Sequence, residues 1–278
     1  DGKVMAVAFM ANTQHLYYRE DVLKELGIPV PKTYEEVVAA SEKIRASGKM
    51  QHPYAAAYKA GWNLAEEFVN MFIGHGGEFF KAGTAEPNIN NAKGVATLNM
   101  LKKLASLSNP DYLTHDSEAI KVEWESGKVA LMTLWASRSG TLLDDEGDAK
   151  ITAATKLTGP ATVGGGNIPA ATLWWDGFTL AKNRSDSDAE ATFIALAHAA
   201  SNKKMVADAA DQAVWLVEGF VPGPKSIGVI EAVKMGAKPY PMLPQMGLMH
   251  GALGSEIVEF LQGKESACLL YTSPSPRD

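Results

Sequence analysis

The feature that most constrains this fold is the alternation of short apolar runs with longer amphipathic segments. The strand-like runs are residues 4–11, 54–58, 128–135, 148–157 and 172–183. The segments with helical periodicity are residues 16–26, 30–48, 63–77, 91–107, 116–127, 187–202, 202–213, 226–236 and 254–263. Strands that alternate with helices are typical of α/β proteins, in which helices cover the faces of a sheet. We therefore predict an α/β fold.

Segment 30–48 carries the clearest helix signals. Thr33 is placed to accept a hydrogen bond from the backbone of Glu36 while the Glu36 side chain returns one, which is the capping-box pattern. Gly48 follows as a helix terminator, because glycine readily adopts the left-handed backbone conformation needed there. The apolar residues of the segment fall on one stripe, which predicts that this face packs on the core. These residues are Val37, Val38, Ala40 and Ile44.

Composition argues against several classes of partner. The chain has 278 residues, a net charge of −6 and no Lys/Arg cluster, so we expect no nucleic-acid partner. Its apolar runs are too short to span a bilayer. The six histidines are scattered without metal-ligand spacing, and the single cysteine is Cys268. We therefore expect no metal site and no other cofactor.

The enzyme motifs that a sequence can show are absent here. There is no nucleophile elbow or phosphate-binding loop, and the glycine-rich stretch 158–170 does not follow the dinucleotide-binding pattern. The adjacent acids Glu66 and Glu67 are interpreted as part of a solvated face. A glycosidase pair assembled from distant carboxylates stays open as an alternative. We predict a binding protein and no catalytic residues.

Three tryptophans lie at positions where α/β sheets commonly bind ligands. Trp62 begins a helix, Trp135 ends an apolar strand, and Trp175 lies near the start of another strand. The carboxyl ends of strands and nearby helix N-termini form the ligand crevice of such sheets. An indole face can stack on the C–H face of a sugar ring. Asp176 and Arg138, close to two of these indoles, can bind its hydroxyl groups.

The pair Trp174–Trp175 poses a question of orientation, because neighbours in a strand point to opposite faces. Either Trp174 packs and Trp175 meets ligand, or the reverse. Trp124 has the helical spacing of a core residue with Ile120, and Trp174 and Trp215 are also interpreted as core.

Six segments carry a family resemblance through their order along the chain. They are LYYREDVLKELGIPVPKTYEEVVAASEKI (16–44), IGHGGEFF (73–80), WESGKVALMTLW (124–135), WWDGFTLAKNRSDSDAEATFIALAHAAS (174–201), GFVPGPKS (219–226) and KPYPMLPQM (238–246). In this order they resemble the extracytoplasmic sugar-binding proteins of ABC importers, solute-binding protein family 1, of the maltose-binding-protein type. The resemblance covers residues 1–267.

The resemblance implies a two-lobed periplasmic-binding-protein fold (type II) with the ligand cleft at its hinge. It also implies that most of the first lobe, the signal peptide and any lipid anchor precede this chain, so the expected location is periplasmic or extracytoplasmic. The implied divisions are 1–173 for the second lobe, 174–182 for the crossing strand, 183–225 for the helical part of the first lobe, and 226–267 for the return to the second lobe.

The function implied is the substrate-binding component of a carbohydrate importer, a monomer that captures a sugar by aromatic stacking and hinge closure and then meets permease subunits in the membrane. The alternatives are a binding protein for a polyol, a glycerol phosphate or a peptide, and a secreted carbohydrate-active enzyme. The candidate ligand-binding residues are Trp62, Trp135, Trp175, Asp176, Gly177, Asn12, Thr13, Glu66, Arg138 and His250. His250 stands where maltose-binding protein has an aromatic platform, which argues against maltose as the ligand.

The last segment, Cys268–Asp278, is interpreted as foreign to the protein. Its sequence, CLLYTSPSPRD, matches the translated end of a sequencing adapter. The alternative is a genuine Ser/Pro-rich tail. If the tail is foreign, so is Cys268, and a chain without cysteine suits an oxidising export compartment.

Overall fold

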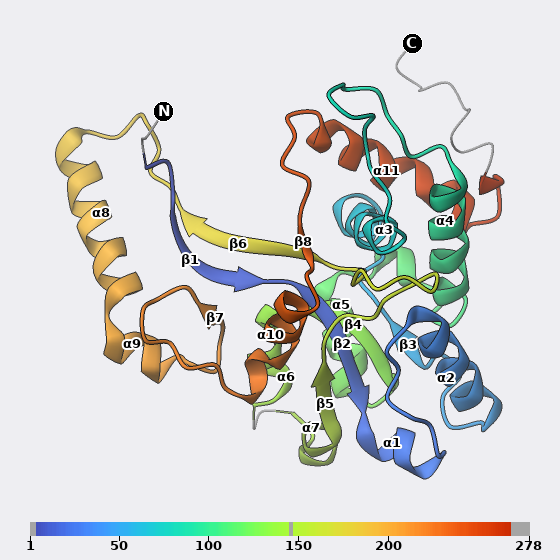
Figure 1. Ribbon diagram of the computed structural model, residues 1–278. Coiled ribbons are helices and arrows are strands. Elements are labelled where there is room, and N and C mark those ends of the chain that lie inside the picture. The colour runs from blue at the N-terminus through green and yellow to red at the C-terminus, as the bar shows by residue number, and fades with distance from the viewer. Residues whose placement is uncertain (1–3, 145–146, 268–278) are drawn as a thin grey trace.

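The structure, a computed structural model, describes residues 4–144 and 147–267. It confirms the predicted α/β class and shows a larger and a smaller body joined by a pair of strands (Figure 1). The described helices include none that is long and apolar enough to cross a membrane. The segment predicted to be foreign, Cys268–Asp278, lies outside the described residues.

The larger body is built on a four-stranded mixed sheet in the order β3-β4-β2-β5. Its strands are β2 (Gln14–Arg19), β3 (Tyr54–Ala55), β4 (Leu131–Trp135) and β5 (Thr155–Thr158). Strand β2 runs antiparallel to β4 and β5, whereas β3 runs parallel to β4. The helices of this body are α1 (Glu20–Glu25), α2 (Tyr34–Ala46), α3 (Trp62–Gly74), α4 (Ala92–Ala105), α5 (Ser117–Glu125), α6 (Ser139–Leu142), α7 (Ala149–Ala154), α10 (Ile227–Lys234) and α11 (Met246–Leu261).

Helix α3 is central to the core of the larger body. All of its residues from Leu64 to Gly74 are buried, and it packs against α4 and α11. A helix that is buried on all sides is stable only when neighbours surround it. Its first residue, Trp62, lies at the edge of this packing and is 50% exposed.

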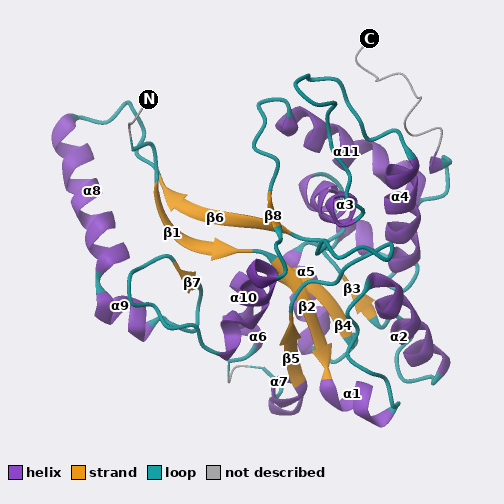
Figure 2. Cartoon of the chain, in the orientation of Figure 1, coloured by secondary structure: helices purple, strands orange, loops and turns teal. Residues whose placement is uncertain are grey.

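A second sheet, in the order β7-β1-β6-β8, runs from one body to the other. Its strands are β1 (Val7–Asn12), β6 (Thr172–Phe178), β7 (Val214–Trp215) and β8 (Lys238–Pro239). Strands β1 and β6 are antiparallel, from the pair Asn12–Trp174 to the pair Val7–Phe178, with an irregularity between Ala8 and Met10. Figure 2 shows this ribbon crossing the space between the bodies.

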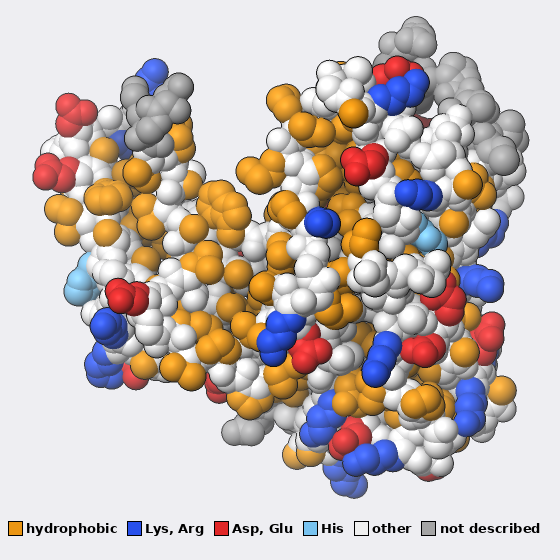
Figure 3. Space-filling view, in the orientation of Figure 1, with side chains coloured by type: hydrophobic (Ala, Val, Ile, Leu, Met, Phe, Trp, Pro, Cys, Tyr) orange, Lys and Arg blue, Asp and Glu red, His pale blue; other side chains and the backbone are white. Residues whose placement is uncertain are grey.

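The smaller body consists of β7, α8 (Asp186–Ser201), α9 (Lys203–Asp208) and the outer ends of β1 and β6. Helix α8 has no buried residue, and Phe193 and Ile194 are 48% and 59% exposed. Figure 3 shows apolar side chains gathered over this body. The apolar surface of the smaller body is therefore only partly covered by the described chain.

The capping box predicted for α2 is confirmed. Thr33 accepts a hydrogen bond from the backbone of Glu36 at 3.1 Å, and the Glu36 carboxylate accepts one from the backbone of Thr33 at 3.2 Å. Gly48 has φ +77°, as expected of the terminating residue. The four predicted core positions of this helix are all buried.

We expect Thr33→Ala to lower the free energy of unfolding by about 1 kcal/mol, because the N-cap bond to α2 is lost. Urea denaturation followed by circular dichroism measures the change. Lys32→Ala is the matched control, since Lys32 contributes only its backbone N–H to the same Glu36 carboxylate. Equal destabilisation by both variants would contradict the role of the cap.

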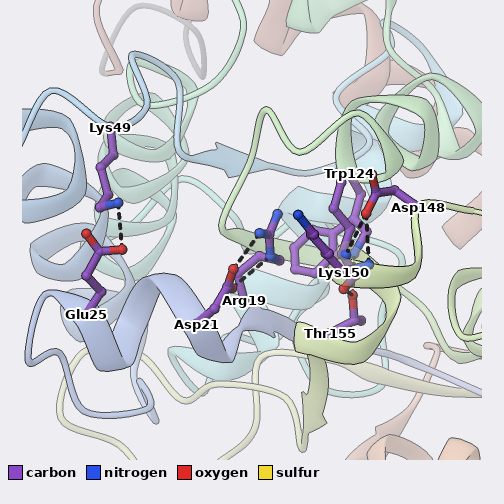
Figure 4. A network of polar contacts seen from close by, with 9 residues as sticks. Arg19, Asp21, Glu25, Lys49, Trp124, Asp148, Lys150 and Thr155 are labelled. Atoms are coloured by element: carbon purple, nitrogen blue, oxygen red, sulfur yellow. Dashed lines mark hydrogen bonds and ion pairs between the residues drawn. The ribbon is translucent and has the colours of Figure 1, made fainter.

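Three predicted elements were wrong. Residues 16–26 were predicted as a helical segment, but residues 16–19 belong to strand β2 and α1 begins only at Glu20. Residues 148–157 were predicted as one strand, but they form α7 followed by β5. The reason is that the Asp148 side chain caps a helix by accepting hydrogen bonds from the backbone of Lys150 and Ile151 (Figure 4). The last helix begins at Met246, not at Gly254. Met246 and Met249 are already buried, so the buried face of this helix starts in its first turn.

The prediction that Trp124 is a core residue is confirmed. Its ring is fully buried, and its indole N–H donates to the Thr155 hydroxyl at 2.9 Å. At the neighbouring end of β2, Arg19 binds both carboxylate oxygens of Asp21, at 2.9 and 2.7 Å (Figure 4). The first contact ties α5 to β5, and the second ties α1 to β2.

Candidate ligand-binding site

Five aromatic rings from distant parts of the sequence converge at the edge of the larger body; we call them the ring cluster. They are Trp62, Trp135, Trp174, Tyr240 and His250. The Trp62 ring centroid lies 6.2 Å from that of Trp135, 5.9 Å from that of Trp174 and 5.0 Å from that of His250. Trp174 also lies 6.0 Å from Trp135 and 4.4 Å from Tyr240. The convergence expected of Trp62 and Trp135 is thus observed.

Each ring is positioned by the element that carries it. Trp62 is the first residue of α3, and Trp135 is the last residue of β4. Trp174 lies in β6, where the ribbon leaves the larger body. Tyr240 directly follows β8, and His250 lies in the second turn of α11. The cluster therefore lies where the larger body meets the crossing ribbon. Figure 3 shows a hollow between the two bodies.

His250 joins the cluster to the backbone of α3. Its Nε2 lies 3.0 Å from the Trp62 carbonyl oxygen, and its Nδ1 lies 2.9 Å from the Tyr240 hydroxyl. A carbonyl only accepts, so Nε2 carries the hydrogen and the Tyr240 hydroxyl donates to Nδ1. Burial lowers the pKa of His250, which favours this neutral form.

Trp62 is the member of the cluster that presents its face to solvent, with 50% of the residue exposed. Trp135 and Trp174 are half-buried, and His250 is buried. Trp174 and Trp215, which were interpreted as core residues, are both partly buried.

Trp175 lies on the other face of β6, as strand alternation requires, and is also 50% exposed. Its ring covers Gly177, where an added Cβ would lie 2.6 Å from the ring. Among the described residues, Trp175 has no ring contact with the cluster. Burial raises the pKa of Asp176, which points to the same side as Trp174.

Asn12, Thr13 and Arg138 hold neighbouring segments together. The Asn12 side-chain oxygen accepts from the backbone of Ser137 at 3.2 Å, and the Thr13 hydroxyl donates to the Thr172 carbonyl oxygen at 2.8 Å. Arg138 forms an ion pair with Glu118. The strand register places Asn12 opposite Trp174, and each of the three residues already has a polar partner.

The interpretation of Glu66 and Glu67 as a solvated face was wrong. Glu66 is 0% and Glu67 is 3% exposed, because α3 is surrounded on all sides. Burial raises the pKa of each carboxyl to about 8. Glu66 lies beneath the ring cluster, where its Oε1 lies 3.2 Å from the indole nitrogen of Trp174 and 2.7 Å from the Thr172 hydroxyl.

Tyr240 was absent from the sequence-based set of candidates. It lies in an extended stretch between prolines, where no periodicity marks a functional position.

Within the described ranges, no three His, Cys, Asp or Glu side chains are grouped so that they could hold a metal ion. The chemistry that the cluster offers is therefore aromatic stacking, with the carbonyl and carboxyl oxygens around it as hydrogen-bond acceptors.

Comparison with known proteins assigns this chain to a family. The model of the family described as bacterial extracellular solute-binding protein matches residues 1–205. A probable ABC transporter-binding protein of Deinococcus radiodurans is 29% identical over 190 residues, which are 66% of this chain and 44% of that protein. The chain thus spans less than half the length of this relative.

Two solved structures show the same fold. A maltose-bound protein of T. maritima, MalE3, has a TM-score of 0.81 at 19% identity, over 98% of this chain and 71% of that one. A solute-binding protein of Agrobacterium radiobacter K84 in complex with ribitol has a TM-score of 0.81 at 20% identity, over 98% and 70%. The periplasmic-binding-protein fold, with its two mixed sheets, and the family match together establish that this chain belongs to the family of bacterial extracellular solute-binding proteins.

Proposed function

We propose that the chain is the part of an ABC importer that binds a neutral saccharide or polyol, and that the ligand stacks on the ring cluster. The observation that carries this proposal is the convergence of five rings from five separate segments around the half-exposed face of Trp62. Such a surface gains binding energy by covering the apolar face of a sugar without needing a charge on the ligand. The maltose and ribitol in the two similar structures are ligands of this kind.

The charges near the cluster favour a neutral ligand over a glycerol phosphate. Arg138, the cation that the sequence suggested for this site, is already paired with Glu118. The nearest buried carboxyl, Glu66, has a raised pKa and so is neutral at pH 7. A phosphate would need free cationic side chains, which bind it through charge-assisted hydrogen bonds.

The arrangement of the two bodies supports capture by closure around the crossing ribbon. In this proposal we assign the larger body, residues 13–173 and 226–267, to the second lobe, and residues 183–225 to part of the first. Strand β1 lies beside β6, so residues 7–12 belong with 174–182 to the crossing. The exposed apolar residues of α8 leave this surface open to packing by another segment. In this proposal, the permease subunits in the membrane recognise the closed form that has captured the ligand.

The test is a titration of the chain with maltose, ribitol, glycerol 3-phosphate and an amino acid, followed by tryptophan fluorescence. We expect a saturable change with maltose or ribitol and none with the two charged solutes, because stacking on the rings requires an apolar sugar face. Isothermal calorimetry on the same samples gives an independent dissociation constant. Saturation by glycerol 3-phosphate or the amino acid alone would overturn the proposal.

A further inference from the structure

Asp176 is a half-buried acid on the crossing ribbon, next to the ring cluster. It lies two residues beyond Trp174 in β6. Side chains two residues apart in a strand point to the same face, and their Cα atoms lie about 6.6 Å apart. Because Trp174 belongs to the ring cluster, Asp176 is the next side chain on that face as the ribbon leaves the larger body.

The side chains around Asp176 leave its carboxylate without a polar partner. Its cross-strand neighbour in β1 is Met10, and the next pair on the same face is Asn12 with Trp174. The Asn12 side chain is already bonded to the backbone N–H and the hydroxyl of Ser137, each at 3.2 Å. Among the described residues, Asp176 has no hydrogen-bond or ion-pair partner. Burial is the only cause that raises the pKa of its carboxyl, so neither a donor nor a nearby cation offsets that burial.

The edge of β6 beside Asp176 is open. Strand β8 flanks β6 at the larger body, but it pairs only with Thr172 and Leu173 (Figure 1). Beyond these two residues, no strand in the described part of the chain pairs with this edge, whereas β1 pairs with the other one. A ligand that stacks on the ring cluster can therefore extend along the ribbon to the carboxylate without displacing a strand.

The other charged candidates do not compensate this carboxylate. Arg138 is paired with Glu118. Burial raises the pKa of the Glu66 carboxyl to about 8, so that group is neutral at pH 7. His250 is held in its neutral form by its two hydrogen bonds. Among the candidate residues that the structure describes, Asp176 therefore contributes the negative charge that is left without a partner.

A carboxylate in this position sets a chemical requirement on the ligand. It accepts hydrogen bonds through two neighbouring oxygens and donates none. Its burial costs free energy, which hydrogen bonds from a ligand recover. Two adjacent hydroxyl groups of a sugar or polyol offer two donors side by side. An acidic sugar instead brings a second negative charge to the same place.

We propose that Asp176 determines the specificity of the ligand site: its carboxylate binds two adjacent hydroxyl groups of the ligand and excludes sugar acids. This inference rests on the proposed function and adds a second reason for a neutral ligand. A site without free cations only fails to attract an acid, whereas an unpaired carboxylate repels it. Discrimination is stronger when the wrong ligand is repelled as well as the right one attracted.

The test compares ribitol with ribonate, and maltose with maltobionate, by isothermal calorimetry at pH 7.5, well above the ordinary carboxyl pKa of 3.8. Each acid keeps most hydroxyl groups of its neutral partner and adds a carboxylate. We expect the unmodified chain to bind a neutral probe about tenfold or more tightly than the matching acid, because like charges brought together are costly. In Asp176→Asn the affinity for the neutral probe should fall about fivefold, since an amide offers one acceptor where the carboxylate offers two. The affinity for the acid should not fall, so the discrimination shrinks.

Two further variants separate charge from position. Asp176→Glu keeps the charge but moves it, so it should still discriminate against the acids while it binds the neutral probe more weakly. Asp186→Asn is the matched control, because it removes the same charge from an exposed position in the first turn of α8. It should leave both affinities unchanged.

The outcomes distinguish this inference from the proposed function. Equal discrimination in Asp176→Asn and the unmodified chain, with saturable binding of a neutral probe by both, would overturn the role of Asp176 and leave the proposed function intact. Absence of saturable binding by every chain and probe would overturn both. Urea unfolding of Asp176→Asn at the same or a higher concentration than the unmodified chain shows that a change in affinity arises at the site.

Discussion

Gly254→Ala should lower the free energy of unfolding by about 3 kcal/mol, near the upper end of the usual range for overpacking. A Cβ at this position in α11 would lie 2.3 Å from the Gly61 carbonyl oxygen, 2.6 Å from its carbon and 2.8 Å from its Cα. These are backbone atoms, which cannot turn aside as a side chain can. Gly61 itself has φ +96°, a conformation that other residues rarely adopt.

The clash should also disturb the ring cluster. The backbone N–H of Gly61 donates to the Gly254 carbonyl oxygen at 3.0 Å, and His250, one turn earlier in α11, binds the Trp62 carbonyl. Pushing α11 away from α3 weakens both contacts at once. We therefore expect Gly254→Ala to lose ligand binding together with stability.

Gly251→Ala is the matched control for this prediction. Gly251 lies in the same helix, and an added Cβ there meets nothing within 4 Å. Alanine is the better helix former, so this variant should gain roughly 0.5–1 kcal/mol. Thermal unfolding followed by circular dichroism compares the two variants. A similar midpoint temperature for both would show that the α3–α11 approach is looser than described.

Trp62→Ala should weaken the binding of maltose or ribitol by more than tenfold, which corresponds to about 1.4 kcal/mol. Trp62 is the half-exposed member of the ring cluster, so its indole is the face left for a ligand to cover. The same exposure means that the variant should unfold at nearly the same urea concentration as the unmodified chain. Titration followed by calorimetry measures the dissociation constant.

Two variants sharpen this test. Trp62→Phe keeps an aromatic face and should lose less affinity than Trp62→Ala. Trp175→Ala removes an indole that is equally exposed but lies on the other face of β6. A tenfold loss with Trp175→Ala and none with Trp62→Ala would place the ligand on that other face, in agreement with the sequence-based assignment of Trp175.

Local signals were sufficient to predict the elements whose causes are local. The capping box of Thr33 and Glu36 defines α2 because all its partners lie within four residues. Segment 148–157 was predicted wrongly because its β-branched residues suggested a strand, while the Asp148 side chain stabilises the start of a helix. Gly254 suggested a helix start, but it lies inside α11, where α3 leaves no room for a side chain.

The site was less predictable because distant contacts determine it. Alternation in β6 shows that Trp174 and Trp175 face opposite ways, but it does not show which side the other rings occupy. The burial of Glu66 depends on Thr172, 106 positions further along the chain. Two adjacent acids suggest a solvated surface when only their neighbours in sequence are known. Only the packing of α3 against α4, α11 and β6 makes them interior residues.

The two-stranded ribbon of β1 and β6 has a consequence for how the protein is studied. Trp174 and Trp175 belong to the segment that must bend if the bodies change their relative angle, and their indoles face opposite sides of it. Bending would move one indole toward its surroundings and the other away from them. Because the two indoles have different surroundings, replacing each in turn separates its contribution to the tryptophan emission, so bending of the ribbon can be followed through native residues without an attached dye.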